Sequence, residues 1–146
     1  MSADSRSKGR DRFLQREANL SEAFYEITVE TTFSASHQLR DYEGVIEPLH
    51  GHNFRVQAAV HAPELDRIGV VVDFLELEAM LKEIMAPYDH RHLNELAPFD
   101  RLNPSTENMA RLFYDELVRK LASRKVEVRS VRVWEAPTYS ASYGLP

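Results

Sequence analysis

The sequence predicts an α+β fold with the element order β-β-α-α-β-β. Two segments with strand-like alternation come first, over residues 22–38 and 50–61. Two segments with apolar residues at helical spacing follow, and two further alternating segments end the chain. Because the strands come in sequential pairs, separate from the helices, they are expected to form antiparallel hairpins, as in the α+β class.

The first two strands are indicated by alternation and by β-branched and aromatic residues. Along residues 22–38, side chains are expected to point alternately to the two faces of the strand. Phe24, Glu26 and Thr28 share one face, and Tyr25, Ile27 and Val29 share the other. One side of residues 50–61 is apolar and carries Phe54, Val56, Ala58 and Val60. The residues between them include Arg40, Asp41, Gly44 and Pro48, so we expect a hairpin with a wide connection.

Each of the two helices has a start signal followed by an apolar stripe. Asp73 can cap the first helix, with Glu76 as its capping-box partner, and Pro87 ends it. The stripe of this helix consists of Phe74, Leu77, Leu81 and Ile84. Asn103 and Pro104 are expected as the N-cap and first residue of the second helix. Its stripe consists of Met109, Leu112, Phe113, Leu117 and Leu121.

The last two strands lie on either side of Pro137. The third strand is marked by Val126, Val128, Val131 and Val133, with a switch of phase near Ser130. A short fourth strand is expected over residues 139–143.

Composition divides the chain into two parts and excludes several classes of protein. Residues 1–21 carry five basic side chains and no sustained apolar period, so we expect a mostly disordered arm followed by one domain over residues 22–146. The net charge of −5 argues against a nucleic-acid-binding surface. No apolar run is long enough for a membrane span, and no signal-peptide core follows the basic start, so a cytoplasmic protein is expected.

Three histidines form a candidate metal site. His50 and His52 are two residues apart on a predicted strand, so their side chains leave the same face, and His37 can approach them across the hairpin. Three imidazoles with an open fourth position are the ligand set of a catalytic zinc ion. The chain has no cysteine, which excludes thiolate ligands. The alternative is that these are separate loop histidines with ordinary hydrogen bonds.

The motifs around these histidines resemble a known family. The motifs are Phe33-Ser34-Ala35-Ser36-His37, Leu49-His50-Gly51-His52-Asn53-Phe54, Val72-Asp73-Phe74, Asp89-His90-Arg91-His92-Leu93-Asn94, Asn103-Pro104-Ser105-Thr106-Glu107-Asn108 and Val133-Trp134-Glu135. Their order and spacing resemble those of the 6-pyruvoyltetrahydropterin and 6-carboxytetrahydropterin synthases. The resemblance implies a tunnelling fold, in which two helices back a four-stranded antiparallel sheet. It also implies a zinc-dependent lyase with a pterin triphosphate substrate, assembled as a homohexamer of two stacked trimers.

The resemblance also implies roles for individual residues. Glu135 corresponds to the glutamate that anchors the pterin, because a carboxylate can accept two N–H donors of the ring; its alternative is a solvated strand end. Thr106 and Glu107 correspond to a second segment near the pterin, and their alternative role is helix capping. Asp89 and His90 correspond to a pair in which the carboxylate orients an imidazole that moves protons. Two further histidines are expected outside the catalytic set, His92 at the surface or behind the site and His61 on the sheet surface.

The chain departs from the usual family pattern at the catalytic base. Most members place a cysteine in the loop before His-Gly-His, whereas this loop contains Glu47. It therefore resembles the glutamate-type members, which convert 7,8-dihydroneopterin triphosphate to 6-hydroxymethyl-7,8-dihydropterin. The alternatives for Glu47 itself are a catalytic base or a solvated loop residue. The alternatives for the protein are a 6-carboxytetrahydropterin synthase, a 6-pyruvoyltetrahydropterin synthase and an inactive pterin-binding homologue.

Overall fold

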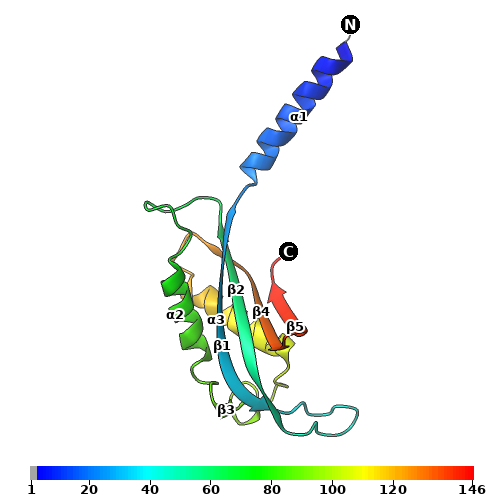
Figure 1. Ribbon diagram of the computed structural model, residues 1–146, viewed down its shortest axis with the longest axis vertical. Coiled ribbons are helices and arrows are strands. Elements are labelled where there is room, and N and C mark those ends of the chain that lie inside the picture. The colour runs from blue at the N-terminus through cyan, green and yellow to red at the C-terminus, as the bar shows by residue number, and fades with distance from the viewer. Residues whose placement is uncertain (1–2) are drawn as a thin grey trace.

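Two helices cover one face of an antiparallel sheet in the computed structural model, which describes residues 3–146 (Figure 1). The elements in chain order are α1 (Ala3–Ser21), β1 (Tyr25–His37), β2 (His50–Ala62), α2 (Phe74–Met85), β3 (Arg91–His92), the 3₁₀ turn η1 (Leu93–Glu95), α3 (Thr106–Lys120), β4 (Glu127–Ala136) and β5 (Tyr139–Gly144). The expected α+β class and order of the main elements are confirmed.

The sheet has the strand order β3-β1-β2-β4-β5. β1 and β2 pair along their whole length, from Tyr25 opposite Ala62 to His37 opposite His50. The register of β2 with β4 shifts between Ala59 and Val60, opposite the stretch that contains Ser130. A bulge inserts one residue into a strand and reverses the alternation of faces beyond it, which accounts for the phase switch expected at that position.

A short fifth strand was not expected from the sequence. β3 pairs in parallel with the end of β1 and places Arg91 opposite Ala35 and His92 opposite Ser36. Two residues are too few to show any period, so this strand has no signal of its own in the sequence. Its effect is to bring the Asp89–His92 segment against the strand that carries His37.

The caps of the two main helices agree only in part with the sequence. Asp73 caps α2 and accepts a hydrogen bond from the Leu75 N–H at 2.7 Å, as expected. The prediction that Asn103 caps α3 was wrong, because Ser105 is the cap and its Oγ accepts from the Asn108 N–H at 3.2 Å. The side chain of Asn103 is instead bonded to the backbone of Arg40, so it cannot reach the helix.

The core lies between the sheet and the two helices. Phe33 and Phe54 stack across β1 and β2 with ring centroids 5.0 Å apart, and Phe113 of α3 packs edge-on against Phe33 at 5.7 Å. The valines of β4 complete this layer, since Val131 and Val133 are fully buried. Large apolar side chains buried in this way supply most of the stability of a domain of this size. The core ends at His37, which is 3% exposed.

The N-terminal arm differs from the expected disordered segment. Residues 3–21 form α1, which projects away from the sheet (Figure 1). Every side chain from Lys8 to Ala18 is exposed, so this part of α1 adds nothing to the core. Lys, Arg, Gln, Leu and Ala, which are frequent between residues 8 and 18, have high helix propensity and favour this helix. Across residues 3–146, none of the helices combines the length and apolar composition needed to cross a bilayer.

Candidate functional site

The three histidines expected as metal ligands meet where the β1–β2 hairpin opens. His37 pairs with His50 in the register, and His52 lies one step further along β2, opposite Ala35. One ring nitrogen from each histidine can be chosen so that all three lie within 4.8 Å of one another. The alternation of β2 therefore brings the two histidines of the His-Gly-His motif to the same face, beside His37.

Gly51 allows this close arrangement of the two strands. It lies between the two histidine positions and faces the other side of the sheet. A Cβ atom at Gly51 would meet the Ala35 carbonyl oxygen at 3.2 Å, which is tighter than an ordinary contact. A residue without a side chain is therefore suited to this position.

Hydrogen bonds orient two of the rings so that Nε2 faces inward. The Nδ1–H of His37 donates to the Pro104 carbonyl at 2.7 Å, and the Nδ1–H of His50 donates to the Pro48 carbonyl at 2.8 Å. A carbonyl only accepts, so Nδ1 carries the proton and Nε2 of the neutral ring carries a lone pair. The two Nε2 atoms lie 3.1 Å apart.

Two further observations fit a cation bound by the three histidines. First, Nε2 of His52 is buried and has no hydrogen-bond partner among the described residues. Second, Nδ1–H bonds from ligating histidines to backbone carbonyls are the usual outer contacts of metal sites. Three neutral imidazoles with inward lone pairs match the ligand set of zinc.

Burial keeps His37 in the form that a metal requires. Burial lowers the pKa of His37 below its ordinary value of 6.5, and the nearby His50 and His52 act in the same direction. The Pro104 carbonyl and the charge of Glu135 act in the opposite direction but do not overcome it. His37 therefore remains neutral to a lower pH than a solvated histidine.

Glu47 is turned toward the three histidines although its loop is mostly exposed. The preceding residues Val45 and Ile46 are more than 60% exposed, whereas the Glu47 side chain is 27% exposed. Its Oε2 accepts a hydrogen bond from the Leu39 N–H at 3.1 Å, and its Oε1 lies 3.9 Å from Nε2 of His50. A freely solvated loop residue would not have these contacts, so the carboxylate is held at the edge of the site.

Glu135 and the segment before α3 both act on the His37 ring. Glu135 lies near the end of β4, where the pairing with β5 is irregular, and it lines a cavity with Asn53 and Arg55; its charge acts on His37. The His37 ring contacts Pro104, two residues before Thr106. Thr106 does not cap α3; its hydroxyl donates to the Glu107 carboxylate at 3.3 Å. The Pro104 contact and the charge of Glu135 are the two links between these expected pterin-binding segments and His37.

Asp89 and His90 form the expected pair at the outer edge of β1. Asp89 Oδ1 accepts from the Ser34 N–H at 2.9 Å and lies 3.0 Å from Nδ1 of His90. The Ser34 N–H and His90 together hold the pKa of Asp89 below its ordinary value. His90 has a φ of 58°, in the left-handed region, and its side chain is 80% exposed. Strained backbone of this kind is concentrated at functional sites.

The Asp89–His90 pair and the histidine group meet only at a shared cavity. His90 and His52 both line a cavity of about 490 Å³ together with Ser34, Ser36 and Asn53. No hydrogen bond or ion pair joins Asp89 or His90 to the three histidines within residues 3–146. The Asp89–His90 pair thus lies beside the three histidines and shares a cavity with His52, but it does not contact the candidate metal ligands.

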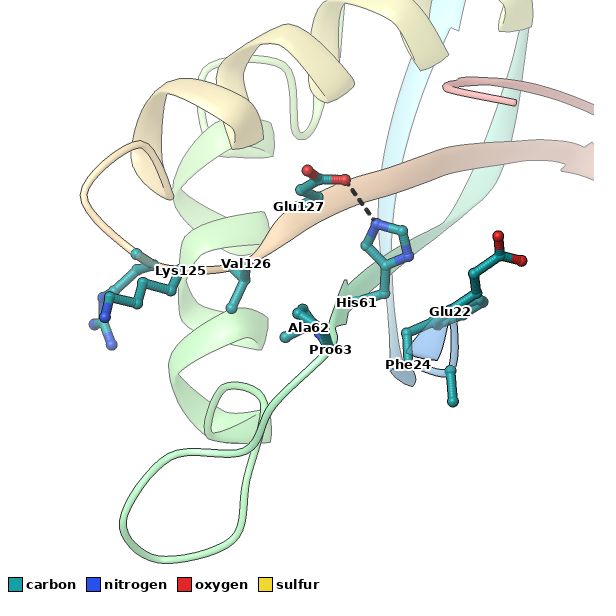
Figure 2. A pocket seen from close by; sticks show the side chains of 10 residues that line it. Glu22, Phe24, His61, Ala62, Pro63, Lys125, Val126 and Glu127 are labelled. Carbon is teal, nitrogen blue, oxygen red and sulfur yellow. Dashed lines mark hydrogen bonds and ion pairs between the residues drawn. The ribbon is translucent and has the colours of Figure 1, made fainter. Parts of the chain in front are cut away.

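The two remaining histidines have separate surroundings. Nδ1 of His92 lies 3.1 Å from the Ser36 hydroxyl, behind the end of β1. His61 lies near the far end of the sheet from the three histidines, and its Nε2 lies 3.0 Å from Glu127 (Figure 2). It lines a cavity of about 450 Å³ there, with Phe24, Lys125 and Glu127 among its neighbours. His61 is therefore only partly at the surface, and it does not belong to the metal group.

Two asparagines near the site were given no role of this kind from the sequence. Asn94 and Asn103 hydrogen-bond through their side chains to the backbone of Gln38 and Arg40, in the segment that follows His37. Both asparagines belong to the family-like motifs, but their hydrogen-bond partners are 56 and 63 residues away in the sequence. No periodicity or local turn pattern could have identified these contacts.

Comparisons with known proteins identify a matching family model, similar sequences and a similar fold. A model of the 6-pyruvoyl tetrahydropterin synthase family matches residues 26–145. The chain is 34% identical to the dihydroneopterin monophosphate aldolase of Pyrococcus furiosus over 109 residues, which cover 75% of this chain and 88% of that protein. It is 32% identical to the 6-carboxy-5,6,7,8-tetrahydropterin synthase of Bacillus subtilis over 126 residues, which cover 82% and 84%. The structure of Caenorhabditis elegans 6-pyruvoyl tetrahydropterin synthase is similar in fold, with a TM-score of 0.72, 20% identity and coverage of 85% and 97%.

Proposed function

Because the chain belongs to the 6-pyruvoyl tetrahydropterin synthase family, we propose that it is a zinc-dependent lyase that converts 7,8-dihydroneopterin triphosphate to 6-hydroxymethyl-7,8-dihydropterin, a folate precursor. The observation that carries this proposal is the position of Glu47. Its carboxylate is held 3.9 Å from Nε2 of His50 in a chain that has no cysteine. The usual thiol base has no counterpart here, and a carboxylate occupies the same loop.

The relatives by themselves do not distinguish between the reactions of the family. The aldolase from Pyrococcus furiosus and the carboxytetrahydropterin synthase from Bacillus subtilis are 34% and 32% identical to the chain. Because these two identities are nearly equal, they give no ground for preferring one reaction over the other. The choice therefore depends on which groups this chain places at the reacting atoms.

The metal would be held by His37, His50 and His52, whose inward Nε2 atoms support this assignment. A zinc ion bound there supplies Lewis acidity toward the hydroxyl oxygens of the substrate side chain. The Pro104 and Pro48 carbonyls keep the rings of His37 and His50 in the required tautomer. Burial keeps His37 neutral.

Glu47 would act as the general base for cleavage of a carbon–carbon bond. It takes the proton of a side-chain hydroxyl, and the oxygen left behind forms a carbonyl as the bond between the two side-chain carbons nearest the ring breaks. The electron pair passes to the carbon beside the pterin and into the ring. That carbon then gains a proton, which we assign to His90, oriented by Asp89. A phosphorylated aldehyde leaves, and the hydroxymethyl pterin remains.

The pterin ring would be anchored by Glu135, with Thr106 and Glu107 nearby. A carboxylate can accept both the ring N–H and the 2-amino group, which orients the ring as well as binding it. Glu135 is close enough to His37 for its charge to affect the pKa of that ring. This proximity supports a substrate that reaches from Glu135 to the three histidines.

Replacing Glu47 by Gln tests the proposal. The variant keeps the size of the side chain and an oxygen for the Leu39 N–H, but removes the basicity. We expect turnover to fall by about 10²–10⁴-fold while substrate still binds, which is the usual contribution of a general base. Glu43→Gln is a matched control, because Glu43 lies in the same loop and is exposed. A native rate in Glu47→Gln would exclude Glu47 as the base.

A second candidate is a cysteine-free 6-carboxy-5,6,7,8-tetrahydropterin synthase, which the Bacillus subtilis relative favours. Chromatography of the products from dihydroneopterin triphosphate separates the candidates. Hydroxymethyl-dihydropterin supports the proposal, and carboxy-tetrahydropterin supports the second candidate. Absence of product from zinc-loaded protein that binds pterin would indicate an inactive homologue.

A further inference from the structure

The segment that follows His37 is held by two asparagine side chains from the loop between β3 and α3. Asn94 accepts a hydrogen bond from the Gln38 N–H at 2.9 Å and donates to the Gln38 carbonyl at 2.8 Å. Asn103 makes the same two bonds with Arg40, at 2.8 and 2.9 Å. Each amide therefore satisfies both main-chain groups of one residue, as a neighbouring strand would.

Arg40 ties the two segments together in the reverse direction. Its guanidinium donates to the Phe99 carbonyl at 2.8 Å and to the Asn94 carbonyl at 3.1 Å. The same loop ends at Pro104, whose carbonyl orients the His37 ring. The 94–104 segment thus contacts both His37, one of the three candidate metal ligands, and the residues that follow it.

The residue between the two clamped positions is the one that contacts Glu47. In extended backbone, successive N–H groups point to opposite sides, so clamping Gln38 and Arg40 on one side directs the Leu39 N–H to the other. That N–H donates to Oε2 of Glu47 at 3.1 Å, and the Leu39 carbonyl accepts from the Glu47 N–H at 3.0 Å. Gln38 adds a third link through its side chain, which donates to the Glu47 carbonyl at 3.0 Å.

Packing alone does not explain how the loop holds its shape. Four of its large apolar side chains are more than half exposed, namely Tyr42, Val45, Ile46 and Leu49, whereas Leu39 is half-buried. The loop is also long, since residues 38–49 connect β1 to β2. The hydrogen bonds of residues 38–40 therefore fix its inner end together with the partial burial of Leu39.

We propose that Asn94 and Asn103 are positioning residues for Glu47, which aim its carboxylate at the three-histidine group by fixing the Leu39 N–H. This inference rests on the proposed role of Glu47 as base. The two asparagines do not touch the substrate; they act through the backbone of residues 38–40. A displacement of about 1 Å at a reacting group can cost on the order of 10²-fold in rate.

The first test replaces each asparagine by the near-isosteric Leu, which removes both hydrogen bonds without adding a charge. We expect Asn103→Leu and Asn94→Leu each to lower kcat by about 10-fold or more, with KM changed less than about 2-fold and zinc content retained. Gln57→Met is the matched control, because it removes an amide that bonds to Glu30 on the sheet away from the loop. A native kcat in both leucine variants would overturn the proposal.

A double-mutant cycle separates positioning from a general loss of stability. Asn103→Leu is combined with Glu47→Gln, which has no base left to aim. If Asn103 acts through Glu47, the added loss in kcat in this background is less than about 2-fold. An equal loss in both backgrounds would refute the inference while leaving the role of Glu47 intact. A native rate in Glu47→Gln alone would instead refute the proposed function.

Hydrogen exchange on the metal-free protein provides a readout that does not depend on activity. The Leu39 and Glu47 amides are expected to be protected in the parent chain and to exchange at least about 10-fold faster in Asn103→Leu, with the β2 amides unchanged. Unchanged exchange at Leu39 would show that the clamp does not order this segment. If Asn103→Leu fails to fold, Asn94→Leu serves for all three measurements, since it acts on Gln38.

Discussion

The Nε2 atoms of His37 and His50 lie 3.1 Å apart, and the Nδ1–H of each ring is bonded to a main-chain carbonyl. In the neutral rings, this arrangement directs two lone pairs at each other. Such a contact is repulsive unless a cation or a proton lies between the two atoms. The lowered pKa of His37 disfavours the proton, so the geometry favours a metal.

We therefore expect about one zinc ion per subunit in purified protein. Replacing His37, His50 and His52 together by Ala should abolish binding, because no other described residue completes the set. His61→Ala is the control, since His61 pairs with Glu127 away from the site. Elemental analysis provides the measurement, and an unchanged metal content in the triple variant would show that the metal binds elsewhere.

The stability of the metal-free protein should depend on pH through His37. Burial lowers the pKa of His37 in the folded chain below 6.5, so between the two pKa values the unfolded chain binds more protons. The free energy of unfolding is then fully retained above about pH 6.5 and declines as the pH falls from there toward the folded pKa. Denaturant titrations from pH 7.5 to 5 check this.

His37→Gln isolates this contribution from that of the other titrating groups. The variant cannot take up a proton at this position, so its unfolding free energy should decline less steeply below pH 6.5 than that of the parent. Parallel curves for the two proteins would show that His37 does not contribute to the pH dependence.

Glu135→Ala should weaken pterin binding without releasing the metal. Losing a carboxylate that accepts two N–H donors is expected to cost about 2–4 kcal/mol of binding free energy, by analogy with hydrogen bonds to charged groups. Calorimetry with a dihydropterin measures the affinity. Glu127→Ala, at the other end of the same strand, should bind as the parent does. Equal affinity in the two variants would remove the anchor role from Glu135.

The protein is expected to form a homohexamer. The segment with β3 covers only Ser34, Ala35 and Ser36 on the outer side of β1, and β5 forms the opposite edge of the sheet, so residues 25–33 and β5 present open edges. The unpaired N–H and C=O groups of such edges are a template for pairing with another chain. Light scattering should give the mass of six 16.8 kDa subunits. A monomeric mass at micromolar concentration would contradict the expectation.

Side-chain alternation determined most of what the sequence could predict. The core face of β2, which carries Phe54 and Val56, continues to His50 and His52, so a period of two was enough to place both histidines on one face. Likewise, Asp73 caps α2 by accepting a hydrogen bond from the N–H of Leu75, two residues further along the chain. Predictions of this kind succeeded because each depends on residues close together in the chain.

Contacts between distant segments were decided only by the tertiary structure. β3 forms where two residues pair with the end of β1, and Ser105 caps α3 while the Asn103 side chain is bonded to Arg40. The sequence alone determined that a glutamate occupies the loop before His50. Only folding decided that Glu47 faces the histidines, because the Leu39 N–H that holds it is aligned by amides 56 and 63 residues from their partners. Such hydrogen bonds leave no local pattern, since nothing but chain folding brings their partners together.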